Sequence, residues 1–161
     1  MGFALAEVAA NLGAKVILVC GPTTEKTQHP QIQVKSIVSA MEMFEEVKEV
    51  YPSVDIAIGA AAVADYKPEL VAEHKIKKKN NNISINLVPT QDILAYMGTH
   101  KKNQYLLGFA LETENELVNA IEKLQRKNLD GIVLNSLQDP GAGFSVSTNK
   151  ITYIHSNKSI Q

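Results

Sequence analysis

Small residues followed by a carboxylate form the first group with chemical potential. The segment Gly59–Tyr66 reads GAAAVADY and follows a predicted apolar strand. In open parallel α/β sheets, ligands bind beyond the carboxyl ends of the strands. Small side chains at such an end let a flat ring or a phosphate approach the backbone, and Asp65 offers a carboxylate for a metal or a ribose hydroxyl. The alternative is that the alanines permit close helix packing and that Asp65 belongs to a turn.

A run of lysines forms the second group. Residues Lys75–Lys79 read KIKKK and precede three asparagines. A basic loop of this kind can close over a polyphosphate and neutralise charge in a transition state. A solvated charge run, or lysines that guard a sheet edge, explains the same pattern.

The third group lies at predicted element ends. Thr90–Ile93 opens a short helix, whose free N–H groups can read a base edge or a phosphate, although ordinary capping gives the same sequence. Phe109, near the end of an apolar strand, can stack on a base. Lys123 and Lys127 are one helical turn apart and suit either a polyphosphate or an exposed face. Asn135 ends a further apolar strand and points to the same rim of the sheet.

Composition and charge exclude several classes of protein. The 161 residues carry 16 Lys+Arg against 17 Asp+Glu, so no global field attracts a nucleic acid. The single Cys20 and four scattered histidines match no zinc spacing. No Walker loop, GxGxxG or GxSxG occurs, nor an apolar run long enough for a membrane span. We therefore expect one cytoplasmic domain over residues 1–161, without nucleic-acid or membrane partners.

Helical and strand patterns alternate along the chain, which predicts an α/β fold: a three-layer, Rossmann-like, mostly parallel sheet with helices on both faces. Some of its strands, such as Lys15–Cys20, read as buried. The predicted helices are Gly2–Leu12, Ala40–Val50, Gln91–Met97 and a helix from Thr113 to Asn128. The predicted strands are Lys15–Cys20, Ile32–Val38, Val54–Ala62, Ile83–Leu87, Tyr105–Ala110, Asp130–Asn135 and Lys150–His155; Ala64–Lys79 and Gly141–Thr148 are predicted loops.

Capping signals fix two of the helices. Ser39 with Glu42, and Thr113 with Glu116, are spaced as capping boxes. Gly98 is expected to stop the helix that begins at Gln91. The residues expected on buried helix faces are Met41, Phe44 and Val47 in one helix and Leu117, Ala120, Ile121 and Leu124 in another.

A helix that begins at residue 2 and leads into a strand at Lys15 is the second half of a βαβ unit. The strand and phosphate-binding turn that precede such a helix are not in the sequence, which favours a domain shortened at its N-terminus. We expect a gap or an exposed sheet edge where that strand belongs.

Read in order, AAVADYKPE, HKIKKK, PTQDIL, GFALET, KLQRKNLD and IVLN resemble phosphopantothenate–cysteine ligase, often the C-terminal half of a bifunctional bacterial protein of coenzyme A biosynthesis. The resemblance covers nearly the whole chain. It implies a homodimer, which in bifunctional members of the family is fused to a flavin-dependent decarboxylase. It also implies that CTP, with Mg²⁺, activates the 4′-phosphopantothenate carboxylate as an acyl-cytidylate, from which cysteine displaces CMP.

The resemblance assigns roles residue by residue. Lys75 matches the catalytic lysine that promotes acyl-cytidylate formation, and Asp65 matches a nucleotide-contacting aspartate that also suits the metal. Asn135 is placed with the substrate. The other residues matched to the nucleotide site are Ala60, Ala61, Gln91, Asp92, Ile93, Leu94, Phe109, Lys123 and Lys127.

The chain departs from the family pattern in three ways. Met1-Gly2 matches only the end of a stretch usually similar to SNHSSGKMG, whose asparagine serves the second half-reaction. The sequence stops before the last family helix, and Gln91 stands where proline is usual. We therefore expect a folded chain that binds CTP more tightly than ATP but forms little phosphopantothenoylcysteine.

Two other functions fit parts of the pattern. A Rossmann-type oxidoreductase would need a glycine-rich turn before Gly2 and a ribose-binding acid after Cys20, where Gly21-Pro22 stands instead. A non-catalytic nucleotide-binding module needs neither feature.

Overall fold

The computed structural model describes residues 1–77, 82–136, 150–157 and 159–161. The predicted loop Gly141–Thr148 and the lysines Lys78 and Lys79 lie outside these residues. The described helices are α1 (Gly2–Asn11), α2 (Ala40–Val50), the 3₁₀ helix η1 (Tyr51–Ser53), α3 (Ile93–His100) and α4 (Glu116–Arg126). The strands are β1 (Val16–Cys20), β2 (Ile32–Ser36), β3 (Ile56–Gly59), β4 (Tyr66–Pro68), β5 (Leu87–Pro89), β6 (Tyr105–Glu112), β7 (Gly131–Ser136) and β8 (Ile151–His155).

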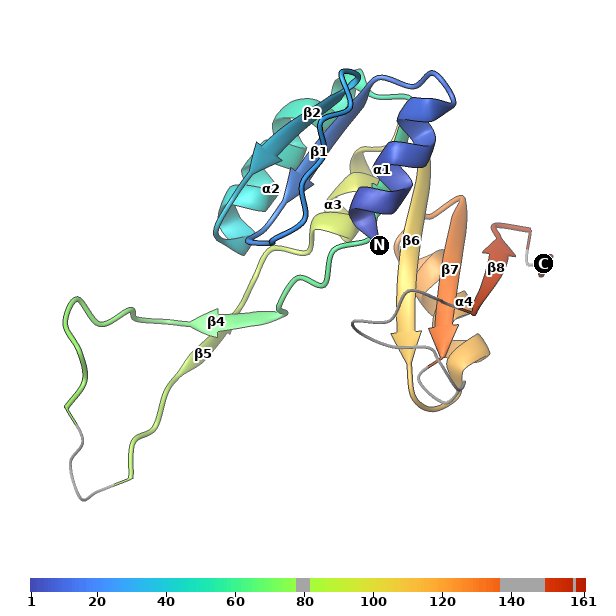
Figure 1. The fold of residues 1–161 in the computed structure, drawn as a ribbon. Helices are drawn as coiled ribbons and strands as arrows, with labels where there is room; N and C mark the ends of the chain where they lie inside the picture. The colour runs from blue at the N-terminus through green and yellow to red at the C-terminus, as the bar shows by residue number, and fades with distance from the viewer. Residues whose placement is uncertain (78–81, 137–149, 158) are drawn as a thin grey trace.

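The described strands form three sheets (Figure 1). β1 and β2 form a parallel pair. The largest sheet has the order β3-β6-β7-β8, in which only β8 is antiparallel to its neighbour. β4 and β5 form an antiparallel pair that lies apart from the helices. The predicted α/β class with a mostly parallel sheet is confirmed.

The main core lies on the face of the four-stranded sheet that α3 and α4 cover. Leu106 and Ala110 of β6 and Ile132 and Leu134 of β7 point to this face and are buried. α4 adds Ala120 and Leu124. A strand buried on both faces is typical of parallel sheets, and β7 is buried over its first five residues.

Helix α2 begins as its capping box predicts. The Glu42 N–H donates to Ser39 Oγ, and the Glu42 carboxylate accepts from the Val38 N–H at 2.9 Å. This backbone bond and the Ser39 hydroxyl lower the pKa of Glu42. The buried face is shifted from the prediction, because Met43 is buried while Met41 is 44% exposed.

The second predicted capping box is wrong. Helix α4 begins at Glu116, after Asn115 in a left-handed conformation with φ of 47°. Glu116 instead accepts a hydrogen bond from the Ser136 hydroxyl at 2.6 Å. The helix also ends earlier than predicted, at Arg126, and Leu117 is exposed rather than buried. A contact with β7, which sequence spacing cannot reveal, takes the carboxylate away from the cap.

Helix α3 is displaced along the chain from its prediction. It runs from Ile93 to His100, so Gly98 lies inside it and does not end it. A Cβ at Gly98 would lie 1.9 Å from the Lys127 carbonyl oxygen. The glycine therefore permits a close approach between α3 and the end of α4.

Several strand boundaries also differ. β3 stops at Gly59, so Ala60–Ala62 are not in the strand, whereas β6 continues to Glu112. The predicted strand Ile83–Leu87 is wrong except at Leu87, because the pairing of β5 begins there. β4 lies in a stretch predicted as loop, and it exists because Lys67 pairs with Val88 across 21 residues of chain.

Two strands expected to be buried are partly exposed. In the described chain, β1 pairs with β2 alone and β3 with β6 alone. Ile17 in β1 is 37% exposed, and Ile56 and Ile58 in β3 are 61% and 42% exposed. β1 and β3 therefore each have one edge that no other described strand covers. Separately, none of the described helices is long and apolar enough to cross a membrane.

Candidate functional site

The carboxyl end of β3 is packed closely against the start of α3. A Cβ at Gly59 would lie 3.0 Å from Leu94 Cδ1, and a Cβ at Gly108 would lie 3.2 Å from Leu94 Cδ2. Gly59 thus serves helix packing. Beyond it, Ala60 is half-buried and Ala61 is exposed, so the backbone that follows β3 is open to a ligand.

A pair of hydrogen bonds joins the segment of Asp65 to the segment before α3. The Thr90 N–H donates to the Asp65 carbonyl at 2.8 Å, and the Thr90 hydroxyl donates to the Ala64 carbonyl at 2.6 Å. Asp65 is exposed. The structure therefore brings together two predicted groups that are 25 residues apart in sequence.

Asp92 caps α3 and binds a lysine of α4. Its Oδ1 accepts from the Ala95 N–H at 2.9 Å, and its Oδ2 pairs with Lys127 Nζ. Burial raises the pKa of the Asp92 carboxyl, but the Lys127 hydrogen bond and the Ala95 N–H outweigh it, so the pKa is lowered. Asp92 thus holds the start of α3, and the lysine is engaged within the protein.

The other residues at the start of α3 differ in their exposure to solvent. Gln91 is exposed. Ile93 and Leu94 are half-buried and pack against the main core. Their side chains therefore support the fold, and recognition of a base here would depend on the N–H groups of the first helical turn.

Lys123 reaches back to β6. Its Nζ donates to the Phe109 carbonyl at 2.9 Å, and Phe109 is half-buried. Since Lys127 is bound to Asp92, the two predicted phosphate lysines each have a partner within the chain.

Asn135 is buried at the end of β7. It is 8% exposed, and its Oδ1 has no hydrogen-bond partner. Its neighbour Leu134 points to the main core, so Asn135 lies on the opposite face of the sheet. Asn135 therefore does not share a face with the lysines of α4.

The structure does not bring Lys75 to the other predicted residues. Lys75 is exposed and follows β4. Figure 1 shows that β4, β5 and the described residues that follow β4 and precede β5 extend away from the helices and the other sheets. Lys75 and Lys77 are therefore placed for contact with solvent or with a molecule that approaches from outside.

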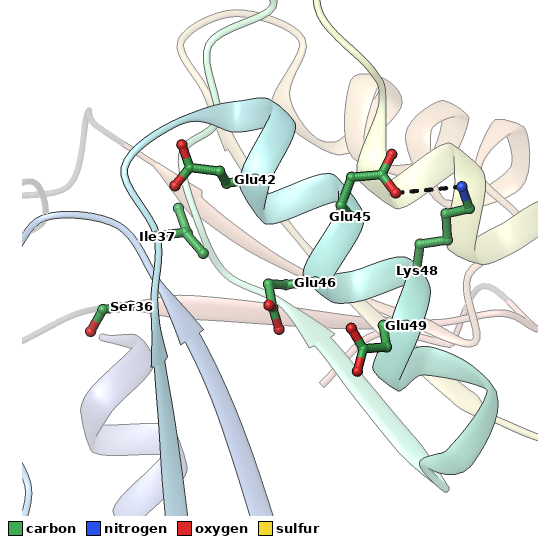
Figure 2. A pocket seen from close by; sticks show the side chains of 7 residues that line it. All are labelled: Ser36, Ile37, Glu42, Glu45, Glu46, Lys48 and Glu49. Carbon is green, nitrogen blue, oxygen red and sulfur yellow. Dashed lines mark hydrogen bonds and ion pairs between the residues drawn. The ribbon is translucent and has the colours of Figure 1, made fainter.

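The described residues contain no group of three or more histidine, cysteine, aspartate or glutamate side chains that would hold a metal ion. A hollow of about 530 Å³ lies elsewhere, between α2 and the end of β2 (Figure 2). Its lining includes Glu42, Glu45, Glu46 and Glu49, with Glu46 bound to Lys35 at 2.7 Å. Because these carboxylates repel phosphates, and because no predicted site residue lines the hollow, we place the site at the end of β3.

Sequence reasoning missed Asn119, which donates to the Glu112 carboxylate at 3.2 Å where β6 ends. It included Thr90 in a candidate group but not the role of the Thr90 side chain, which fixes the Asp65 segment. Thr90 had a detectable signal, since a hydroxyl beside a helix start commonly bonds nearby backbone.

The mostly parallel sheet and the helices that pack on it define an α/β domain. The chain belongs to the family described as DNA/pantothenate metabolism flavoprotein C-terminal domain, which matches residues 1–161.

Three comparisons illustrate the relationship. The chain is 53% identical, over 99% of its length, to a cysteine/cysteine sulfinic acid decarboxylase of an unknown prokaryotic organism, and 45% identical, over 94%, to the coenzyme A biosynthesis bifunctional protein CoaBC of Bacillus subtilis. It spans 45% and 37% of these relatives. The crystal structure of the C-terminal domain of CoaBC matches 99% of this chain and 70% of that chain, with 38% identity and a TM-score of 0.81.

Proposed function

We propose that the chain takes part in coenzyme A biosynthesis as a ligase that joins 4′-phosphopantothenate to cysteine with CTP. Family membership and the similarity to CoaBC support this proposal. The observation that carries it is the pair of Thr90 hydrogen bonds, because they hold the Asp65 segment against the start of α3. Two of the segments that the resemblance assigns to the nucleotide are thereby adjacent.

The metal role belongs to Asp65 in this proposal. Mg²⁺ is commonly held by one or two carboxylates together with substrate phosphates and water, so a cluster of protein ligands is not required. The exposed Asp65, beyond the end of β3, fits that arrangement. Bound there, Mg²⁺ would neutralise charge on the triphosphate.

The start of α3 reads the base. Gln91 and the N–H groups of Ile93 and Leu94 present polar atoms there, while Asp92 fixes the helix end. Ala60 and Ala61 leave room for the nucleotide, and Phe109 stacks beside it. Lys123 and Lys127 bind the phosphates by exchanging their present partners, the Phe109 carbonyl and Asp92, for phosphate oxygens.

Lys75 supplies positive charge during nucleotidyl transfer. Its position between β4 and β5 requires this segment to fold over the nucleotide, which would also exclude water from an acyl-cytidylate. Asn135, on the opposite face of the sheet from α4, binds the phosphopantothenate side of the reaction.

The active form is a homodimer in this proposal. Between β4 and β5 and in β5 itself, large apolar side chains are exposed, among them Leu70, Val71, Ile83, Ile85 and Leu87. Leu70 and Val71 are each 85% exposed. A second copy that covers this arm would bury them, and exposed apolar clusters of this kind commonly mark interfaces.

The cellular setting is a further part of this proposal. The Bacillus subtilis protein is named as bifunctional, and this chain corresponds to 37% of it. We infer that the domain works in the cytoplasm, in some proteins fused to a flavin-dependent decarboxylase.

Calorimetry with CTP, ATP and NAD, each with Mg²⁺, tests the nucleotide assignment. We expect CTP to bind more tightly than ATP, because helix-start N–H groups discriminate base edges by their donor and acceptor pattern. NAD should bind weakly or not at all. Equal affinity for CTP and ATP would contradict the assignment, and preferential binding of NAD would favour the oxidoreductase.

A second candidate function is a non-catalytic nucleotide-binding module. The position of Lys75, which is exposed and follows β4 apart from the other predicted residues, favours it, because a module that only binds a nucleotide needs no catalytic lysine beside it. The two functions differ in pyrophosphate release. A ligase that carries the family's N-terminal stretch releases pyrophosphate from CTP when 4′-phosphopantothenate is present, whereas a binding module retains CTP intact.

A further inference from the structure

Asp92, the residue that caps α3, has its oxygen atoms engaged within the protein. Its Oδ1 accepts from the Ala95 N–H and its carbonyl accepts from the Tyr96 N–H, both at 2.9 Å. Its Oδ2 pairs with Lys127 Nζ. Asp92 therefore fixes the helix end and is not free to contact a base.

Thr90 is engaged in the same way on the other side of Gln91. Its N–H donates to the Asp65 carbonyl at 2.8 Å, and its hydroxyl donates to the Ala64 carbonyl at 2.6 Å. The backbone on both sides of Gln91 is thereby held. The point from which the Gln91 side chain extends is fixed as a result.

Gln91 is the polar side chain that the fold leaves free at this helix start. It is exposed, and no hydrogen bond within the described residues involves its amide. Ile93 and Leu94, which follow, pack their side chains against the main core, and their N–H groups have no acceptor within the helix. The start of α3 thus offers two donors of fixed position and one amide that is free to turn.

The free amide of Gln91 can present its polar groups in either order. A glutamine amide carries an NH₂ donor beside a C=O acceptor, and its terminal torsion is roughly two-fold. A half-turn exchanges the donor and the acceptor. Because no described neighbour bonds to the Gln91 amide, neither order is favoured before a ligand binds.

This reversibility matters because cytosine and uracil differ in the order of two groups on one edge. Cytosine has the N4 amino donor beside the N3 acceptor, whereas uracil has the O4 acceptor beside the N3–H donor. One orientation of the Gln91 amide pairs with cytosine, and the other pairs with uracil. The two bases share the O2 acceptor, which suits the N–H groups of Ile93 and Leu94.

The purines do not match the two fixed donors. At the place that corresponds to O2, adenine has a C–H group and guanine has an amino donor. Either purine would leave the N–H groups of Ile93 and Leu94 without an acceptor. A site built to donate hydrogen bonds rejects a ligand that lacks the acceptor.

We propose that Gln91 determines the base specificity of the nucleotide site, which takes CTP and UTP alike and rejects ATP and GTP. This inference rests on the proposed function, because that function places the base at the start of α3. The proline that is usual at this position of the resembled family has no such amide. The inferred acceptance of UTP therefore belongs to the glutamine of this chain.

Calorimetry of the whole chain with CTP, UTP, ATP and GTP, each with Mg²⁺, tests the specificity. We expect the dissociation constants of CTP and UTP to agree within about threefold, because each base makes the same number of hydrogen bonds. ATP and GTP should bind at least about tenfold more weakly, because they leave donors unpaired.

The substitution Gln91→Met keeps the length of the side chain and removes its amide. Because the residue is exposed, the fold should tolerate the change. We expect it to weaken CTP and UTP alike, by about three- to tenfold. Gln33→Met, an exposed change in β2, is the matched control and should leave both affinities unchanged.

The triphosphate of pyrimidin-2-one riboside, which is CTP without the amino group, isolates the contact. It should bind the unmodified chain about three- to tenfold more weakly than CTP does. With Gln91→Met the two ligands should bind equally. A general loss of affinity would weaken both ligands in the variant and would not remove the difference between them.

The outcomes separate this inference from the proposed function. If CTP binds and UTP binds more than about threefold more weakly, other groups read the base, so the inference is wrong while the proposed function stands. The same conclusion follows if Gln91→Met changes neither affinity. If ATP binds as tightly as CTP, or if none of the four nucleotides binds, the proposed nucleotide assignment fails and the inference fails with it.

Discussion

The carboxylate of Asp92 illustrates how one residue couples structure to charge. It caps α3 and pairs with Lys127, and these contacts lower its pKa despite partial burial. One carboxylate makes both contacts. If Lys127 moved to a triphosphate as proposed, Asp92 would keep only its hydrogen bond to the start of α3. The residue therefore serves stability before any ligand binds.

Acid titration should reveal this contribution. Since the folded pKa lies below the ordinary value of 3.8, the stabilisation is complete above that pH and is lost as the pH falls through the folded pKa. We expect the free energy of unfolding of the unmodified chain to fall more steeply below about pH 4 than that of Asp92→Asn. Denaturant unfolding at a series of pH values measures it. Glu45→Gln, at an exposed ion pair, is the control, and identical acid slopes for all three proteins would contradict the assignment.

A substitution of the single residue Lys75 tests the proposed catalytic step. If its charge stabilises nucleotidyl transfer, Lys75→Gln should slow pyrophosphate release by about 10²–10³-fold, with a much smaller change in CTP affinity. The assay needs a version that carries the N-terminal stretch of the family. Lys67→Gln, on the neighbouring strand β4, is the matched control. An unchanged rate in Lys75→Gln would contradict the catalytic role and favour the alternative interpretation, in which the lysines are a solvated charge run.

At the scale of elements, α3 depends on contact with the end of α4. Gly98 lies inside α3, where a Cβ would lie 1.9 Å from the Lys127 carbonyl oxygen, and Asn128 Nδ2 donates to the Gly98 carbonyl at 2.8 Å. Helix propensity alone favours alanine over glycine by about 1 kcal/mol. Here the contact with backbone outweighs propensity.

We therefore expect Gly98→Ala to destabilise the protein by about 1–3 kcal/mol, because backbone must shift to admit the methyl group. Gly2→Ala is the matched control, since Gly2 is also helical and nothing lies within 4 Å of its added Cβ. Chemical denaturation compares the two. Equal stability of both variants would show that α3 and α4 separate easily.

At the scale of the whole molecule, the arm formed by β4 and β5 carries apolar surface outside the core. We expect the chain to dimerise in solution and the double change Leu70→Ser with Val71→Ser to weaken the dimer at least about tenfold, because both side chains are 85% exposed in one copy. Sedimentation equilibrium measures the association. Val8→Ser with Leu12→Ser, two residues exposed in α1 and at its C-cap, is the control. A monomer at all concentrations, or equal weakening by both pairs, would contradict the arm as the interface.

The sequence by itself determined the elements whose signals are local. The Ser39 cap placed the start of α2 correctly, its predicted end at Val50 agrees with the structure, and the apolar runs located β1, β6 and β7. The alternation of helices and strands was sufficient for the α/β class, because hydrophobic periodicity and capping act within a few residues.

Only the tertiary structure decided features that depend on distant partners. Glu116 binds Ser136 instead of capping α4, Gly98 packs on Lys127 instead of ending α3, and β4 exists because β5 pairs with it. The same holds at the site, where the Thr90 bonds and the Asp92–Lys127 pair join segments that are far apart in sequence. Such contacts are fixed when elements pack together, and a local pattern of residue types does not encode which distant group will be near.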